Sequence, residues 1–324
     1  MDRPFTIVPA LTAIAIGFRN PASAYIADTV MPRVPVPAEK FGWTHYPIEE
    51  AFNLPDAEVG RTGRVQRLEF GGEQRDSSVK DYGLDSPIPY SDIEAAREAR
   101  QRKVSNFDPE AHAVMSLTDT ILNIREVRVA TMMGNAANYA AARKIALAGT
   151  DRFDDYDNSD PIGVIREGIY STLVVRPTDI NMGRAEWKAL SGHPKIVKAV
   201  KGGISGDGMV TVEQFRELFA GDGIKRVNIG DAFYNTAKPG QAHNLERAWG
   251  GFMSLTHTNP MANPQGGGIT FGFTAQYGSR VAGRIVDEDI GLQGGVRVRS
   301  GERVRELIVA EDAGYLIQTP VTPE

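Results

Sequence analysis

The sequence predicts an α+β fold whose helices gather in the middle of the chain and whose strands dominate its last third. Two observations carry this prediction: a strongly capped, long amphipathic helix begins near residue 108, and short strand-like segments follow one another from residue 250 onward. The chain has 324 residues, of which 41% are hydrophobic and 24% charged. That length and composition suit a folded protein with one large or two ordinary cores.

Charge and cysteine content exclude several classes of protein. The 36 basic and 41 acidic residues give a net charge of -5, the wrong sign for a protein whose whole surface binds nucleic acid. Without cysteine, the chain forms no disulfides and no thiolate metal sites. The first apolar run, Ile7 to Phe18, is too short to span a bilayer and lacks signal-peptide features. We therefore expect no membrane partner and a cytoplasmic product.

The first sixty residues are expected to form an extended arm, because prolines interrupt any helix there. Its apolar side chains are too numerous for a solvated tail, so neighbouring subunits are their natural cover. The prolines are Pro4, Pro9, Pro21, Pro32, Pro35, Pro37, Pro47 and Pro55. The apolar residues are Phe5, Ile7, Leu11, Ile14, Ile16, Phe18, Tyr25, Ile26, Phe41, Trp43 and Tyr46.

A long hairpin is predicted after the arm. Residues Arg64 to Phe70 and Ser77 to Leu84 flank Gly71-Gly72, a dipeptide typical of tight turns. Both segments are mostly charged, and such a hairpin is not stable alone, so it should lie on another surface. The alternative is a disordered loop.

The strongest helix signal is Asp108-Pro109-Glu110, which supplies an N-cap, a proline at the first helical position and a favourable acidic residue. An apolar stripe follows, and the helix should run to about Met133, roughly 36 Å at 1.5 Å per residue. Its stripe consists of Val114, Leu117, Ile121 and Ile124. We expect this apolar face, and no polar side chain, to be what the helix cannot lose.

The remaining elements follow from local patterns. A helix begins at Asp160-Pro161 and buries Ile162, Ile165 and Ile169. Further helices are expected at Asn181–Leu190 and Val212–Phe219. Strands are expected at Leu173–Val175, Arg226–Ile229, Phe252–Thr256, Ile269–Ala275, Val281–Val286, Val296–Arg299, Val304–Val309 and Tyr315–Thr319.

The acidic stretch "RFDDYDNSDP" does not match the pattern of a calcium loop. Counted from Asp155, the sequence places Asp160 where the EF-hand pattern needs glycine and Arg166 where it needs glutamate. The pattern therefore fails at its two most demanding positions. Asp160 is better explained as a helix N-cap, with a weak cation site as the alternative.

No pattern predicts catalysis. The glycine-rich stretches "GGISGDG" and "QGGGITFGF" lack the phosphate-loop lysine, there is no nucleophile elbow, and no two histidines have metal-ligand spacing. His193 precedes Pro194 and is expected to cap a helix. We therefore expect no enzyme and assign no catalytic, cofactor-binding or metal residues and no cofactor.

One basic strip could contact DNA. Alternation in "GVRVRSGERVREL" places Arg297 and Arg299 on one face of a strand and Val296 and Val298 on the other. Arg303 and Arg305 continue the strip. It could touch packaged DNA nonspecifically, but a solvated face or ion pairs with a neighbouring subunit suit the negative chain better.

The order of these parts resembles the major capsid (coat) protein of tailed double-stranded-DNA bacteriophages, whose fold is that of the Hong Kong phage coat and is shared by encapsulin shells. The resemblance spans essentially the whole chain. It is carried by "VKDYGLDSPIPYSDIEAAREA", "STLVVRPTDINMGRAEWKALSGHPKIVKAVK", "VNIGDAFYNTA", "AWGGFMSLTHT" and "GVRVRSGERVRELIVAEDAGYLIQT".

The resemblance implies four parts. These are an N-terminal arm (1–55), an extended hairpin loop (56–90), a peripheral domain with a long spine helix (91–150 and 251–307) and an axial α/β domain (151–250 and 308–324). Some such relatives join subunits covalently through a lysine and an asparagine. Here the corresponding side chains would be Lys80 and either Asn259 or Asn263.

The same resemblance implies a function and partners. The chain would self-assemble into hexamers and pentamers of an icosahedral shell that encloses phage DNA, within a virion assembled in the bacterial host cytoplasm. Portal and scaffold proteins, a decoration protein and nonspecific contact with packaged DNA on the inner face are the further partners that the resemblance implies. The alternatives are an encapsulin-like or gene-transfer-agent shell and, from another class, a soluble α/β hydrolase or metal-dependent enzyme.

Overall fold

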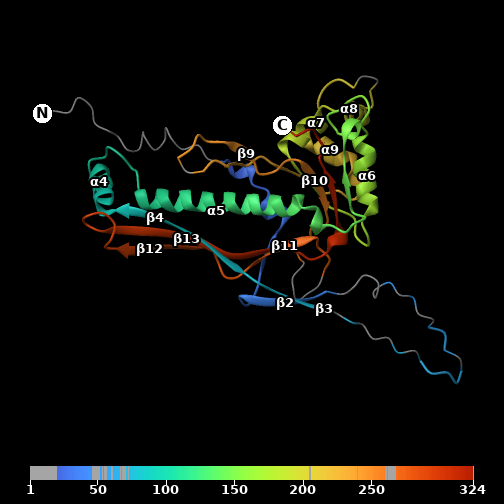
Figure 1. The fold of residues 1–324 in the computed structure, drawn as a ribbon, viewed down its shortest axis with the longest axis horizontal. Coiled ribbons are helices and arrows are strands. Elements are labelled where there is room, and N and C mark those ends of the chain that lie inside the picture. Colours follow the sequence, from blue (N-terminus) through green and yellow to red (C-terminus); the bar gives the residue numbers. More distant parts are fainter. Residues whose placement is uncertain are drawn as a thin grey trace.

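The longest helix, α5 (Pro109–Gly134), extends along the length of the molecule, with an α/β lobe at its C-terminal end and α4 (Tyr90–Gln101) at its N-terminal end (Figure 1). The structure is a computed structural model. It describes residues 20–323 except 46–51, 53, 55, 56, 60, 66, 68–70, 72, 204, 205, 239, 260 and 262–267. The predicted arm residues before Asn20 therefore lie outside the described residues.

The start of α5 confirms the sequence prediction. The Asp108 carboxylate accepts hydrogen bonds from the backbone N–H groups of Glu110 (3.0 Å) and Ala111 (3.3 Å). The predicted stripe holds as far as Ile121, which is buried, but Ile124 is 42% exposed. The buried side of the helix continues instead through Arg125 and Glu126, each 1% exposed. The buried side of this helix therefore includes two charged side chains that the apolar stripe did not predict.

A five-stranded sheet lies along one side of α5 and has β13 (Gly295–Ile308) at its centre. One edge of β13 pairs with β4 (Lys80–Pro89), and the other pairs first with β12 (Val281–Asp287) and then with β11 (Gly272–Gln276). The short strand β1 (Arg33–Pro35) adds to β11 in parallel.

The predicted strands Val296–Arg299 and Val304–Val309 are one continuous strand, which corrects their separation in the sequence prediction. Between them, Gly301 of β13 pairs with Gly83 of β4 and Val281 of β12. The close approach to β4 leaves no room for a side chain, since a Cβ at position 301 would lie 2.8 Å from the Tyr82 carbonyl oxygen. Glycine is thus needed for close strand approach and not for a turn.

The α/β lobe contains a second five-stranded sheet, ordered β5-β14-β10-β6-β7. Its core includes Phe153, Ile165, Leu190 and Phe215, all fully buried. The strands are β5 (Lys144–Ala146), β14 (Gly314–Gln318), β10 (Phe252–Thr256), β6 (Asp179–Gly183) and β7 (Arg226–Gly230). The helices are α6 (Pro161–Ser171), α7 (Arg184–Ser191), α8 (Pro194–Lys201) and α9 (Val212–Leu218).

Two predictions in this lobe are wrong. Leu173–Val175 forms no strand: the Val175 N–H donates to the Leu173 carbonyl at 2.7 Å across Val174, whose φ is +66°. The apolar run therefore makes a tight turn after α6. Asn181 does not begin a helix either, because residues through Gly183 belong to β6 and α7 starts at Arg184. Pairing with β10 and β7 on both sides overrides the local helical pattern there.

The predicted hairpin does not form between its two predicted strands. Strand β3 (Glu73–Ser78) pairs antiparallel with β2 (Lys40–His45), and Arg64, Val65 and Arg67 lie outside any strand. Gly72, half of the predicted turn, lies outside the described residues. The predicted second strand, Ser77–Leu84, is divided between the end of β3 and the start of β4.

Short elements complete the described chain. Phe41 of β2 is buried with Val34 and Phe273, so its own chain, and not a neighbouring subunit, covers this part of the predicted arm. The short elements are η1 (Ala22–Ala24), α2 (Ala27–Val30), η2 (Ala136–Asn138), η3 (Gly149–Asp151), η4 (Ala220–Asp222), β8 (Phe233–Asn235), β9 (Leu245–Arg247) and η5 (Glu311–Ala313).

The two isoleucines of α5 give a matched test of its orientation. Ile121→Ala should lower the free energy of unfolding by about 2–5 kcal/mol because its site is closed. Ile124→Ala, at an exposed site, should change it by less than about 0.5 kcal/mol, and Asp108→Ala should cost about 1 kcal/mol through loss of the cap. Chemical denaturation of the unassembled subunit measures all three, and equal losses for the two isoleucines would contradict this packing.

Candidate functional site at the root of the N-terminal arm

Glu126 joins the N-terminal segment to the middle of α5. Its carboxylate accepts hydrogen bonds from the backbone N–H groups of Ile26 (2.7 Å) and Ala27 (3.0 Å) and from the indole Nε1–H of Trp249 (2.7 Å). Ile26 and Ala27 form the start of α2, whose first N–H groups have no partner within the helix. A carboxylate 99 residues away in sequence thus caps this helix.

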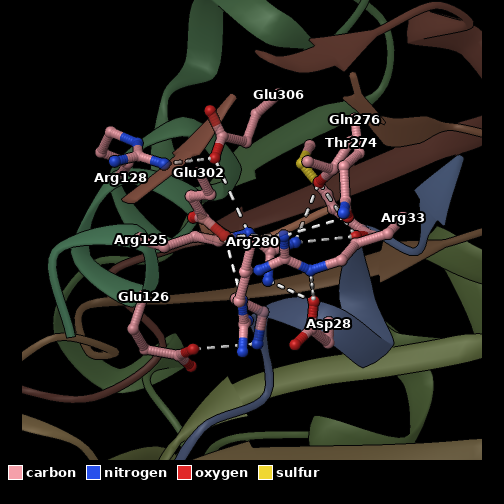
Figure 2. Close-up of polar contacts among 12 residues, drawn as sticks. Asp28, Arg33, Arg125, Glu126, Arg128, Thr274, Gln276, Arg280, Glu302 and Glu306 are labelled. Carbon is pink, nitrogen blue, oxygen red and sulfur yellow. Dashed lines mark hydrogen bonds and ion pairs between the residues drawn. The ribbon is translucent and has the colours of Figure 1, made fainter. Parts of the chain in front are cut away.

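Arg125, the preceding residue, binds the other end of the same segment. Its guanidinium donates to the Met31 carbonyl (3.2 Å) and to Thr274 Oγ1 (3.0 Å), and it forms an ion pair with Asp28 (Figure 2). Thr274 Oγ1 in turn donates to the Met31 carbonyl at 3.0 Å. Helix α5, strand β11 and the end of α2 therefore meet at one carbonyl oxygen.

Two glutamates on the inner face of β13 extend this cluster. Glu302 pairs with Arg33 Nη1 at 2.8 Å and with Arg280 Nε at 3.3 Å. Glu306 pairs with Arg128 Nη2 at 2.7 Å and lies 3.8 Å from Arg125 Nε. We call the whole group the root cluster; its charged members are Asp28, Arg33, Arg125, Glu126, Arg128, Arg280, Glu302 and Glu306. The cluster therefore contains four arginines and four carboxylates. The Arg125, Glu302 and Glu306 side chains are buried, whereas Asp28 and Arg280 reach the surface.

Burial and ion pairing shift the pKa values of Glu126 and Asp28 in opposite directions. Burial raises the pKa of Glu126, and the hydrogen bonds from Ile26 and Ala27 only partly offset it. Burial also opposes ionisation of Asp28, but the guanidinium groups of Arg125 and Arg33 outweigh it and lower the pKa of Asp28. Asp28 is thus held as an anion between two arginines.

The chain continues from the root cluster as part of the sheet. Arg33 pairs in register with Thr274, and the Thr274 N–H donates to the Pro32 carbonyl at 2.9 Å. At the other end of the segment, the Asn20 side chain binds both backbone groups of Phe233, donating to the carbonyl at 2.8 Å and accepting from the N–H at 3.0 Å. Both ends of segment 20–36 are therefore bonded to the rest of the described chain.

Two aspartates of the acidic stretch accept hydrogen bonds from backbone N–H groups of the same chain. Asp155 Oδ1 accepts from the backbone N–H of Asn158 at 3.1 Å, and Asp154 Oδ2 accepts from the Thr322 N–H at 3.1 Å. Among the residues that the structure describes, no three His, Cys, Asp or Glu side chains form a group that could hold a metal. Asp160 precedes α6 as predicted, but its side chain makes no capping hydrogen bond.

His193 caps α8, as the sequence predicts. Its Nδ1 accepts from the Lys195 N–H at 3.2 Å, so Nε2 carries the proton and donates to Ser159 Oγ at 3.0 Å. Burial and the nearby Lys195 lower the pKa of His193, which favours this neutral form. The described residues of "GGISGDG" lie outside helices and strands, and the described part of "QGGGITFGF" leads into β11, which begins at Gly272.

The side chains considered for a covalent link are only partly described. Lys80 lies at the start of β4, opposite Val304 of β13, and is exposed. Asn259 Oδ1 accepts from the Met261 N–H at 3.0 Å, and Asn263 lies outside the described residues. These contacts bring no lysine to an asparagine.

Comparison with known proteins identifies the family, although no protein-family model matches the chain. The chain is 40% identical over 320 residues to the major capsid protein of Pseudomonas phage JBD67, covering 99% of both chains. It is 30% identical over 324 residues to the major capsid protein of Burkholderia phage BcepMu, covering 95% of both. The chain belongs to the family of phage major capsid proteins. It is therefore a component of the virion capsid.

Solved structures share the fold of this capsid protein. A phage-related protein from Bordetella bronchiseptica matches 96% of both chains with a TM-score of 0.66 and 22% identity. The capsid of a native GTA particle (TM-score 0.54, 13% identity, 98% of this chain and 95% of that one) and a Synechococcus elongatus encapsulin (0.51, 10%, 98% and 92%) also have it. These likenesses confirm the predicted α+β capsid fold.

Three of the four arginines in the basic strip of this capsid protein are neutralised within its own chain. Arg299 makes two hydrogen bonds to the Asp85 carboxylate, at 2.7 and 2.8 Å, and Arg297 lies 2.7 Å from Asp287. Arg303 pairs with Glu39 at 2.8 Å. These acidic groups reduce the positive charge of the strip. Within the described chain, no helix is both long and apolar enough to cross a membrane.

Sequence reasoning missed the root cluster. The signal was present in "NIREVRV", where two opposite charges interrupt an apolar helical stripe. A charged pair at stripe positions indicates buried partners, but the partners lie about 100 and 150–180 residues away in the sequence. No local pattern connects such distant residues.

We expect Glu126 to be essential to the fold of the subunit. Glu126→Leu keeps most of the side-chain volume but leaves the Ile26, Ala27 and Trp249 N–H groups without their acceptor, at about 1–3 kcal/mol for each buried donor. Denaturation should therefore show a loss of at least about 3 kcal/mol. Glu98→Leu, at an exposed helical ion pair, is the matched control and should lose less than about 1 kcal/mol. Equal losses would contradict the assignment.

Asp28 should make the unfolding free energy of the subunit depend on pH in the acidic range. Because folding lowers the pKa of Asp28, its contribution is present above its unfolded pKa of about 4 and is lost as the pH falls through the lower folded value. The difference in unfolding free energy between the unmodified chain and Asp28→Asn should therefore be largest near neutral pH and shrink below about pH 4. A difference independent of pH from 7 to 2 would show that the charge of Asp28 is unimportant.

Proposed function

We propose that this capsid protein self-assembles into hexamers and pentamers of an icosahedral shell around the double-stranded DNA of a tailed phage. The observation that carries the proposal is its 40% identity, over 99% of both chains, to a phage major capsid protein. The structure supports it with an elongated subunit that leaves large apolar side chains exposed at several separate places. Such surface is expected in a subunit that completes its burial on assembly.

The proposed parts of the subunit are the arm (1–55), the hairpin loop (56–90), the peripheral domain (91–150 and 251–307) and the axial domain (151–250 and 308–324). In support, α5 and the β13 sheet pack together through Ile88, Ala113 and Val298, whereas the α/β lobe has its own core. Ile26, Ala27, Val30 and Met31 fall within the proposed arm but pack into the same core cluster as Val129 of α5.

The remaining partners are also part of the proposal. Portal and scaffold proteins, a decoration protein and DNA on the inner face are expected from the family, and the function would be geometric and not enzymatic. The neutralised arginine strip supports only weak, nonspecific DNA contact. An encapsulin-like or gene-transfer shell is the alternative, and the presence of a portal in purified particles distinguishes a phage shell from an encapsulin.

Deleting residues Met1 to Phe18 tests the role of the arm. Because the root cluster begins after Asn20, the truncated subunit should remain soluble and helical, with an unfolding free energy within about 1 kcal/mol of the full chain. It should nevertheless fail to form megadalton particles on a sizing column and in electron micrographs. Shells of normal size and stability from the truncated chain would show that the arm is not an assembly element.

A further inference from the structure

Strands β2 and β3 form a two-stranded ribbon that leaves the body of the subunit. They pair with each other along Lys40–His45 and Glu73–Ser78, and with no other strand of the described chain. In Figure 1 the ribbon lies beyond the β13 sheet, on the side away from α5. A single pair of strands is only marginally stable alone, so the direction of this ribbon has to be set at its base.

Two contacts close the base of the ribbon. The Val79 N–H donates to the Glu39 carbonyl at 3.0 Å, which joins the chain that enters β2 to the chain that leaves β3. Phe41 packs with Val34 and Phe273 and attaches the ribbon to the sheet. The first contact links the two sides of the ribbon only to each other, and apolar packing is non-directional. Neither contact therefore fixes the angle between the ribbon and the β13 sheet.

Arg303 of β13 bonds to both sides of this base. Its Nη1 lies 2.8 Å from the carboxylate of Glu39, the residue before β2. Its Nε lies 3.4 Å from the carboxylate of Asp81 at the start of β4. A guanidinium presents its donors in a rigid planar fork, so two carboxylates that bind one arginine are held in a defined relative position. Arg303 thus supplies the directional contact that the base otherwise lacks.

A second arginine fixes the same point of β4 from the opposite face of the sheet. Tyr82 follows Asp81, and successive side chains of a strand point to opposite faces. The guanidinium carbon of Arg128 lies 3.7 Å from the centre of the Tyr82 ring, and Glu306 holds that guanidinium at 2.7 Å. Strand β4 is therefore held from both faces where Arg303 binds it, so Arg303 joins the ribbon to a fixed point of the subunit.

We infer that Arg303 is a positioning residue for assembly: it fixes the direction in which the β2–β3 ribbon leaves the subunit, and so where the ribbon meets a second copy of this chain. The inference rests on the proposed shell function and deepens it. The carboxylates of Glu39 and Asp81 are exposed, so these ion pairs contribute little to the stability of the subunit. Arg303 acts on the geometry of the folded subunit and not on its folding.

Distances between two spin labels test the direction of the ribbon, and labelling is specific because the chain contains no cysteine. The labels are placed at Gln74→Cys of β3 and Thr131→Cys of α5, both exposed, in the unassembled subunit. Arg303→Gln should broaden the distance distribution at least twofold. Arg297→Gln is the matched control and should leave it unchanged. Arg297 lies on the same face of β13, is 40% exposed against 44% for Arg303, and pairs with two carboxylates outside the ribbon.

Particle yield tests the role in assembly. Arg303→Gln should lower the yield of shells at least fivefold, whereas its denaturation midpoint should equal that of Arg297→Gln. Arg297→Gln should assemble like the unmodified chain. Adding Glu39→Gln to Arg303→Gln should lower the yield no further, because both substitutions remove the same contact.

The remaining outcomes also decide the inference. A distance distribution for Arg303→Gln as narrow as that of the unmodified chain, or an equal yield of normal shells, would overturn it and leave the proposed shell function intact. A lower denaturation midpoint for Arg303→Gln than for Arg297→Gln would also overturn it, because Arg303 would then act on stability. Failure of the unmodified chain to form shells would instead overturn the proposed function, and the spin-label distances would still show whether Arg303 fixes the ribbon.

Discussion

The structure depends on two opposite charges that stand side by side in the middle of its longest helix. Arg125 and Glu126 are both buried, and a buried charge is tolerated only when its hydrogen bonds and counter-charges are supplied. Glu126 obtains them from backbone N–H groups of the N-terminal segment, and Arg125 obtains them from Asp28, Met31 and Thr274. The helix, the sheet and the arm root therefore determine one another's positions.

This constraint explains why the arm root belongs to the subunit before assembly. Residues 20–36 are bonded to α5, β8 and β11, so their conformational entropy is already lost when the subunit folds. The ionic cluster also favours one orientation of the root, because Asp28, Glu302 and Glu306 each pair with arginines of the cluster.

The difference between local signals and distant contacts explains which features of the fold the sequence predicts. Helix α5 is predictable because Asp108-Pro109 and the stripe to Ile121 are local signals, and most strands after residue 250 are predictable for the same reason. Predictions failed where pairing with distant residues decides the structure: β3 pairs with β2, Asn181 lies between two strands, and Gly301 continues a strand.

The candidate site itself was beyond sequence reasoning. Its carboxylates on β13 occupy the inner face of a strand whose outer arginines gave the visible pattern, and Glu302 and Glu306 become meaningful only opposite Arg33 and Arg128. Their alternation with the arginines was visible, but which face lies against α5 was not. The resemblance to capsid proteins identified the fold and could not identify how this chain attaches its arm.

Hydrogen exchange at the backbone amides of Ile26 and Ala27, in the unassembled subunit at neutral pH, tests the central claim most directly. If Glu126 holds the arm root within the folded subunit, both amides should be protected to a degree similar to that of Val129 in the interior of α5. Exchange of these two amides at the rate of an unstructured peptide, with Val129 still protected, would show that the root is not attached before assembly.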